Sequence, residues 1–117
     1  MAGLDYLAVA GSFVNVYPEK RDWSDYSVAP HVAYHRAVLA TAVAPVVVRV
    51  DARNVPASAV LHIATFVELA RVVRNEFKGA VGNIFIANAP AVVIALYKLL
   101  RTGGMVGTDT VGKITFT

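Results

Sequence analysis

The twenty residues GNIFIANAPAVVIALYKLLR, numbered 82–101, limit the possible folds of this chain more than any other stretch. Ile84–Ala87 has the composition of a buried strand, and a short turn separates it from the helical segment Pro90–Leu100. Within that segment only Tyr97 and Lys98 carry polar side-chain atoms. A helix that is apolar on nearly every side must be covered by protein, by membrane or by a hydrophobic ligand. The sequence therefore predicts a strand, a turn and an extensively covered helix.

The rest of the composition agrees with a surface that is partly covered. The chain has 117 residues, enough for one domain with a single core, and we expect that domain to span residues 1–117. It is 56% hydrophobic and only 16% charged, against roughly 25% charged in an average domain. So few charges indicate that part of the surface is hidden against a partner or a ligand.

Several function classes are disfavoured by composition. The net charge is +3, but the Lys and Arg residues are scattered and form no nucleic-acid patch. The chain has no cysteine, which excludes a disulfide framework and thiol chemistry. The first residues lack the basic region of a signal peptide, and no apolar run reaches the roughly 18 residues of a spanning helix. These features predict a soluble, cytoplasmic protein without a transmembrane segment.

The pattern of apolar residues predicts alternating strands and helices. We expect strands at Leu4–Ala10, Phe13–Tyr17, Val46–Val50, Ile84–Ala87 and Lys113–Thr117, and helices at about Ser27–Val43, Ala57–Phe77 and Pro90–Leu100. The first two strands form either a hairpin or one strand with a bulge. Val46–Val50 is a continuous β-branched run, which is typical of a strand covered on both faces. Residues 102–112 are expected to form a loop.

The order β(β)αβαβαβ predicts an α/β fold. Its sheet should be mixed but mainly parallel, with four to five strands flanked by helices.

Candidate chemistry is sparse. His31 and His35 share one helical face at a spacing that can hold a metal, but no third ligand is evident, and two ordinary helix histidines near Tyr34 are the preferred explanation. Asp51 follows a buried strand, where α/β folds often place functional carboxylates. It can instead cap the following turn or pair with Arg49 or Arg53. No nucleophile elbow, phosphate loop or carboxylate pair appears, so we expect no enzyme, no cofactor and no metal.

The second half of the chain resembles the CRAL-TRIO lipid-binding family. VVVRVDARNV is similar to the family strand that ends in an Asp-containing turn, and Asp51 takes the Asp place. IFIANAP is similar to the family strand ending in Asn-Ala-Pro, matched by Asn88, Ala89 and Pro90. AVVIALYKLLR looks like the helix that gates the lipid pocket, and TVGKITF like the closing strand.

This resemblance implies a non-catalytic domain that binds a lipid or another small hydrophobic ligand. Family members contact a headgroup through a Glu on the long helix and a basic residue late in the gate helix, which correspond here to Glu68 and Arg101. Val93, Ile94 and Tyr97 of the gate-like helix would line the ligand site. Glu68 can instead pair with Arg71, and Arg101 can simply cap its helix. Peripheral contact with a membrane would be compatible with this function.

The segment VVVRVDARNVPASAVLHIATFVELARV is also similar to STAS domains, which act in protein–protein interaction. These domains carry a phosphorylated Ser after this strand, and Ser58 is the nearest Ser here but lacks the family context. The alternative function is therefore a structural or interaction module without a ligand, either a homo-oligomer or a component of a larger assembly.

Overall fold

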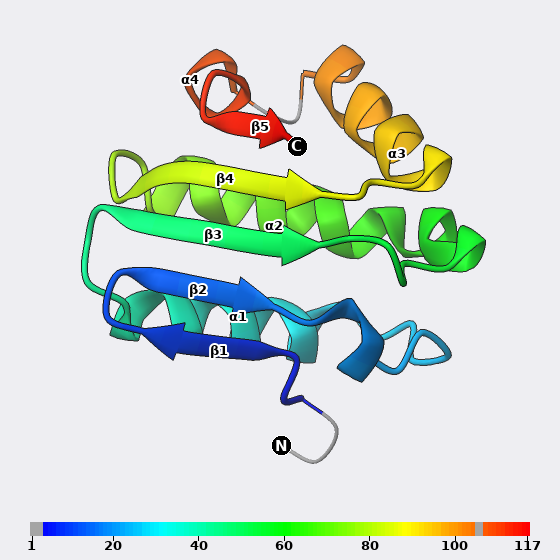
Figure 1. Cartoon of the computed structure of the whole chain (residues 1–117), viewed down its shortest axis with the longest axis horizontal. Coiled ribbons are helices and arrows are strands. Elements are labelled where there is room, and N and C mark those ends of the chain that lie inside the picture. Colours follow the sequence, from blue (N-terminus) through cyan, green and yellow to red (C-terminus); the bar gives the residue numbers. More distant parts are fainter. Residues whose placement is uncertain (1–3, 105–106) are drawn as a thin grey trace.

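The computed structural model describes residues 4–104 and 107–117, which form a five-stranded sheet with helices packed on one face (Figure 1). The elements in chain order are β1 (Leu7–Ala10), β2 (Phe13–Val16), η1 (Pro18–Lys20), α1 (Ala29–Thr41), β3 (Val46–Asp51), η2 (Ala57–His62), α2 (Ile63–Glu76), β4 (Val81–Ala87), α3 (Ala91–Thr102), α4 (Thr108–Val111) and β5 (Ile114–Phe116). The element η1 and the element η2 are 3-10 helices. No helix among the described residues is long and apolar enough to cross a membrane.

The strands lie side by side in the order in which they occur along the chain. β1 pairs antiparallel with β2, and every later pair is parallel. The predicted α/β fold with a mixed, mainly parallel sheet is therefore confirmed. Each parallel connection advances one strand in the same direction, and right-handed crossovers of this kind place all their helices on the same face.

The helices follow this rule. Figure 1 shows α1 and α2 behind the sheet. Tyr97 of α3 packs edge-on against Phe116 of β5, with ring centroids 5.1 Å apart. Phe116 pairs with Ile86, whose side chain belongs to the helix-covered face. The opposite face of β1–β4 has no helix in front of it (Figure 1).

The prediction that Val46–Val50 is covered on both faces is wrong. Burial along β3 alternates from Val48 onward, and Arg49 and Asp51 are exposed. The sequential strand order explains this pattern, because it leaves one side of even the central strand without helices. The buried core lies on the helix side of the sheet, and its apolar residues include Val14, Val32, Val46, Ala59, Val72, Val81 and Leu96.

Several predicted boundaries need correction. The first two strands form a hairpin, closed at Gly11 with φ of +62°, which glycine adopts without a steric penalty. The long helix begins with the 3-10 turn Ala57–His62 and becomes α-helical only at Ile63. The predicted loop 102–112 contains the short helix Thr108–Val111.

The apolar helix α3 is covered less than its sequence indicates. Leu96 is buried, but Leu99 is 51% exposed, and Ala91, Ala95 and Lys98 are exposed as well. One side of α3 packs on η2 and β5 while the other side faces outward. The helix therefore needs no ligand along its buried side.

The free edge of β1 is largely blocked against pairing with another strand. Ala10 and Phe13 flank a two-residue turn and therefore form a hydrogen-bonded pair. Hydrogen-bonded pairs alternate along an antiparallel ladder, so the backbone N–H and C=O groups of Leu7 and Val9 point away from β2. The Tyr34 hydroxyl accepts a hydrogen bond from the Leu7 N–H at 3.0 Å and lies 3.3 Å from the Leu7 carbonyl. Only Val9 of this described strand is left free to pair, which disfavours edge-to-edge association.

Candidate functional site

The uncovered face of the sheet, called here the open face, is a broad surface that the fold leaves without a helix (Figure 1). Side chains of alternate residues point to it from five strands. Its central row, set by the strand register, runs through Ala8, Asn15, Arg49, Phe85 and Thr115. On one side of that row lie Ala10, Phe13, Val47 and Asn83, and on the other lie Asp51 and Ala87. The open face is thus mostly small, apolar or neutral.

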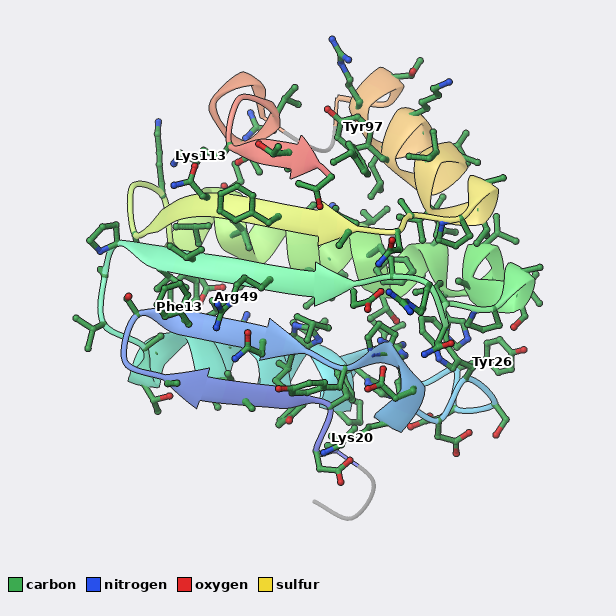
Figure 2. All side chains as sticks on the ribbon, in the orientation of Figure 1. Phe13, Lys20, Tyr26, Arg49, Tyr97 and Lys113 are labelled. Carbon is green, nitrogen blue, oxygen red and sulfur yellow. The ribbon has the colours of Figure 1, made fainter. Side chains whose placement is uncertain are left out.

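Two large aromatic side chains stand on the open face. Phe13 of β2 is 38% exposed and Phe85 of β4 is 37% exposed. Arg49 of β3 lies between these strands, and its guanidinium carbon is 4.1 Å from the centroid of the Phe13 ring (Figure 2). Its Nε donates a hydrogen bond of 2.9 Å to the Asn15 side-chain oxygen. The cation–π contact and this hydrogen bond hold the guanidinium over the Phe13 ring.

A hollow of about 440 Å³ lies on the open face near the carboxyl ends of β2, β3 and β4. Ligands and partners of α/β sheets commonly bind at this end of the strands. Aromatic side chains and charged or amide groups share its lining, which comprises Asn15, Val16, Tyr17, Glu19, Arg49, Val50, Asp51, Asn54, Phe85 and Ala87. The carboxylate of Glu19 makes no hydrogen bond or ion pair among the described residues. The hollow is wide open rather than enclosed.

Asp51 stabilises the turn at the rim of this hollow. Its carboxylate accepts a hydrogen bond from the Arg53 backbone N–H at 3.2 Å and lies 3.2 Å from the Arg53 Nε. Asn88, in the left-handed region with φ of 55°, donates its side-chain N–H to Asp51 at 3.2 Å. Asn tolerates this conformation better than most residues. These hydrogen bonds to Arg53 and Asn88 lower the pKa of Asp51, and they assign it the turn-capping role foreseen as one alternative.

The residues predicted from the lipid-binding resemblance lie elsewhere. Glu68 of α2 forms an ion pair with Arg71, three residues later on the same helix. Arg101 is exposed in the last turn of α3. Val93 and Ile94 are half-buried on α3, whereas Tyr97 packs against β5. None of these five residues lines the hollow described above.

A second hollow, of about 210 Å³, lies beside α2 and is lined by Val67, Arg71, Arg74, Asn75 and Gly104. It also takes no lining residue from Val93, Ile94, Tyr97 or Arg101 of α3. A headgroup role for Glu68 and Arg101 therefore stays a prediction that the two hollows do not favour.

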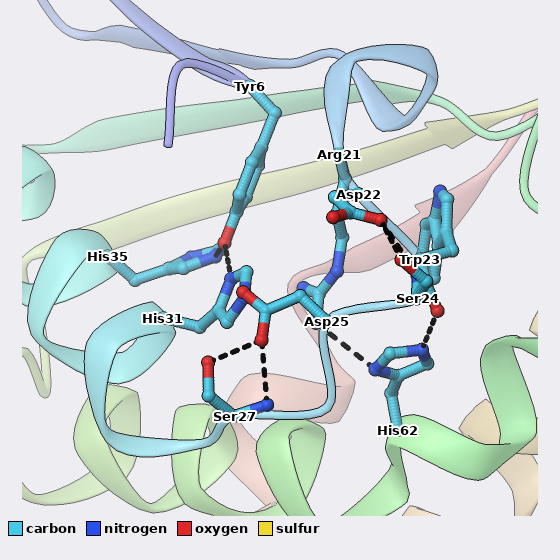
Figure 3. Close-up of polar contacts among 10 residues, drawn as sticks. All are labelled: Tyr6, Arg21, Asp22, Trp23, Ser24, Asp25, Ser27, His31, His35 and His62. Carbon is cyan, nitrogen blue, oxygen red and sulfur yellow. Dashed lines mark hydrogen bonds and ion pairs between the residues drawn. The ribbon is translucent and has the colours of Figure 1, made fainter. Parts of the chain in front are cut away.

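A buried polar cluster lies on the helix side of the sheet, beneath the segment that links β2 to α1 (Figure 3). The Tyr6 hydroxyl, almost fully buried, lies 2.8 Å from Nδ1 of His31 and 3.0 Å from Nε2 of His35. His31 Nε2 lies 3.0 Å from a carboxylate oxygen of Asp25. The two histidines expected to share a helix face thus share a tyrosine partner, and the described residues contain no group of three acidic, His or Cys side chains placed to hold a metal.

The hydrogen bonds of this cluster can all be satisfied with neutral histidines. A carboxylate can only accept, so His31 carries its hydrogen on Nε2 and leaves Nδ1 to accept from the Tyr6 hydroxyl. The Tyr6 oxygen then accepts from Nε2 of His35. Burial, reinforced by Arg21 and His31, lowers the pKa of His35 to about 3. Burial also raises the pKa of Tyr6 to about 12.

Arg21 forms the second half of the cluster. It is only 7% exposed, and its guanidinium carbon lies 5.5 Å from the Tyr6 ring centroid, 4.9 Å from that of Trp23 and 5.8 Å from that of Phe66. One terminal nitrogen lies 3.5 Å from Nδ1 of His62, while Nε is buried without a hydrogen-bond partner. Burial lowers the pKa of Arg21. No carboxylate within the described part of the chain forms an ion pair with this cation.

No protein-family model matches this chain, and neither a curated protein nor a solved structure matches it significantly. The residues themselves must therefore carry any functional argument.

Sequence reasoning missed both the open face and the polar cluster. A signal for the open face is present, because Arg49 interrupts an otherwise apolar run and Phe85 alternates with Ile84 and Ile86. The cluster has no comparable signal, since Tyr6 and His31 are 25 residues apart and Arg21 and His62 are 41 apart.

Proposed function

We propose that this protein is a non-catalytic interaction module, similar in element order to STAS domains, that self-associates through the open face of its sheet. The observation that carries this proposal is the uncovered sheet face bearing Phe13 and Phe85 at more than a third exposure. Exposed apolar surface of this kind marks interaction sites in soluble proteins.

Charge supports a protein partner over nucleic acid. The open face and its rim carry cations at Arg49 and Arg53 and anions at Glu19 and Asp51. The four formal charges cancel, and a nucleic-acid surface would instead need an excess of cations. A twofold interface places the same patch on both subunits, which a neutral patch with both signs of charge tolerates well.

Size and geometry support a second copy. The molecule measures 34 × 32 × 25 Å, and Figure 1 views the sheet along the shortest of these axes. A face of this extent can supply the roughly 800 Å² per partner that a standard interface buries. Two sheets packed face to face lie about 10 Å apart and bury each other's alternate side chains. At the β1 end of the sheet, the blocked edge disfavours the alternative of strand-to-strand pairing.

Replacing Phe85 with Asp is expected to weaken self-association strongly, because it puts an unpaired charge into the buried interface. Sedimentation equilibrium would measure the association constant. Leu99→Asp is the matched control, since Leu99 is also exposed and apolar but lies on α3. We expect the Leu99 variant to associate like the wild type. A wild-type protein that stays monomeric at high micromolar concentration would overturn the proposed function.

Solvent extraction of the purified protein, followed by mass spectrometry, separates this function from lipid binding. We expect no lipid at a stoichiometric level, because α3 lines neither hollow. Recovery of one lipid per chain would favour the lipid-binding alternative.

A further inference from the structure

The segment Pro18–Ser27, called here the strap, connects β2 to α1 and lies over the polar cluster (Figure 3). Its polar contacts with α1 and η2 end on histidines. Asp25 contacts His31, the Trp23 carbonyl accepts from Nε2 of His62 at 2.9 Å, and Arg21 lies against Nδ1 of His62. The strap is therefore fastened to α1 and to η2 through histidine side chains.

His62 can hold Arg21 only while its ring is neutral. Because Nε2 donates to the Trp23 carbonyl, Nδ1 is the nitrogen left to accept from the guanidinium. His62 is 2% exposed and Arg21 is 7% exposed, so water can reach neither contact freely. A proton on Nδ1 would remove the acceptor and place two cations 3.5 Å apart.

Among the described residues, no carboxylate forms an ion pair with Arg21 that would compensate for that second charge. The ionisable groups that the structure describes around the pair are Tyr6, ahead of β1, then Asp22, Asp25 and Tyr26 of the strap, and His31, Tyr34 and His35 of α1. Both carboxylates among them are already engaged. Asp22 accepts hydrogen bonds from Ser24, and Asp25 accepts hydrogen bonds from Ser27 and contacts His31. The Tyr26 ring stacks on His62 with centroids 4.6 Å apart but brings no charge.

The strap also reaches the open face. Glu19, at its beginning, and the preceding Tyr17 line the hollow at the carboxyl ends of the strands. Displacement of the strap would therefore remove part of the rim of the proposed interface.

We propose that the strap is an acid-released latch, in which protonation of His62 expels Arg21 from its aromatic surroundings, frees residues 18–27 and thereby weakens self-association. The last step rests on the proposed function, whereas release of the strap does not.

Hydrogen–deuterium exchange of the whole protein tests the release directly. As the pH falls from about 7.5 to about 5.5, we expect the strap amides to exchange several-fold faster after correction for the intrinsic pH dependence of exchange. The amides of β3 and β4 should keep their protection. Loss of strap protection only together with β3 and β4, or no loss at all, would overturn the latch.

Two substitutions test the mechanism from either side of the contact. His62→Gln keeps a side-chain amide but cannot take up a proton, and Arg21→Met removes the opposing cation. In both variants the strap should exchange at the same corrected rate at both pH values. A strap that still loosens in acid in both variants would contradict the role of His62.

Histidine nitrogen NMR of the wild type keeps the test independent of the variants' folding. We expect His62 to carry hydrogen on Nε2 alone at pH 7.5 and to gain its second proton as the strap loses protection. A His62 that is already doubly protonated at pH 7.5 would overturn the latch.

Sedimentation over the same pH range separates the two proposals. A protein that is monomeric at every pH would contradict the proposed self-association. A dimer that persists after the strap is released would contradict only the proposed link between strap release and self-association.

Discussion

Lowering the pH from about 8 to about 5 is expected to reduce the free energy of unfolding by about 2 kcal/mol through His35 alone. The pKa of His35 is about 3 in the folded protein and 6.5 in its ordinary state, mainly because burial disfavours the charged ring. Between these two pKa values, His35 binds a proton in the unfolded chain but not in the folded protein. The contribution of the neutral ring is complete above pH 6.5 and is lost progressively as the pH falls toward 3.

Denaturant unfolding followed by the fluorescence of the single tryptophan, Trp23, would measure this change. His35→Gln cannot take up a proton, so the difference between its pH profile and that of the wild type isolates the His35 contribution. We expect the wild type to lose more stability than the variant between pH 8 and 5, before most carboxylates titrate. Parallel profiles would show that His35 is not held neutral in the folded protein.

Truncation of Tyr6 to Ala is expected to lower the free energy of unfolding by about 3–5 kcal/mol, the usual cost of removing a large buried aromatic side chain. Tyr6 is 2% exposed and packs against Tyr34, His31 and His35 while its hydroxyl bonds both histidines. The substitution leaves a cavity and removes the hydroxyl that joins the His31 and His35 rings.

Tyr6→Phe separates these two effects. It keeps the ring but leaves His31 Nδ1 without its donor and His35 without its acceptor. We expect the free energy of unfolding to fall by about 1–3 kcal/mol. Denaturant titrations of both variants at neutral pH provide the measurement. A Phe variant as stable as the wild type would contradict the assigned hydrogen bonds.

Alternation of apolar segments was sufficient to predict the α/β class and the mainly parallel sheet. The strand–turn–helix unit at residues 84–100 appears at nearly the predicted positions, as β4 and α3. Its boundaries follow from local chemistry, because Asn88 supports a left-handed turn and Pro90 precedes the first helical residue.

The arrangement of helices around the sheet could not be predicted in the same way. A run such as Val46–Val50 is compatible with a strand covered on both faces or on one. The strand order decides between them, and that order depends on contacts between segments far apart in the chain. The exposure of Leu99 has the same origin, because the position of α3 beside η2 and β5 determines which of its apolar sides is covered.

The candidate site was the least predictable part. The family resemblance points to Glu68 and Arg101, whereas the open face depends on strand register and on the direction of the crossovers. The cluster around Tyr6 and Arg21 depends on a strap whose sequence is polar and has no apolar periodicity. Only the fold brings these side chains together.

The most direct test of the open face as an interface uses the absence of cysteine from the chain. A single cysteine replacing Asn83 reports on the open face, and one replacing Ala37, exposed on α1, serves as the control. The measured quantity is the rate at which each reacts with a bulky maleimide, over protein concentrations from sub-micromolar to millimolar. Self-association through the open face predicts that the Cys variant of Asn83 reacts progressively more slowly with increasing concentration, while that of Ala37 keeps a constant rate. A constant rate at both positions would contradict the account.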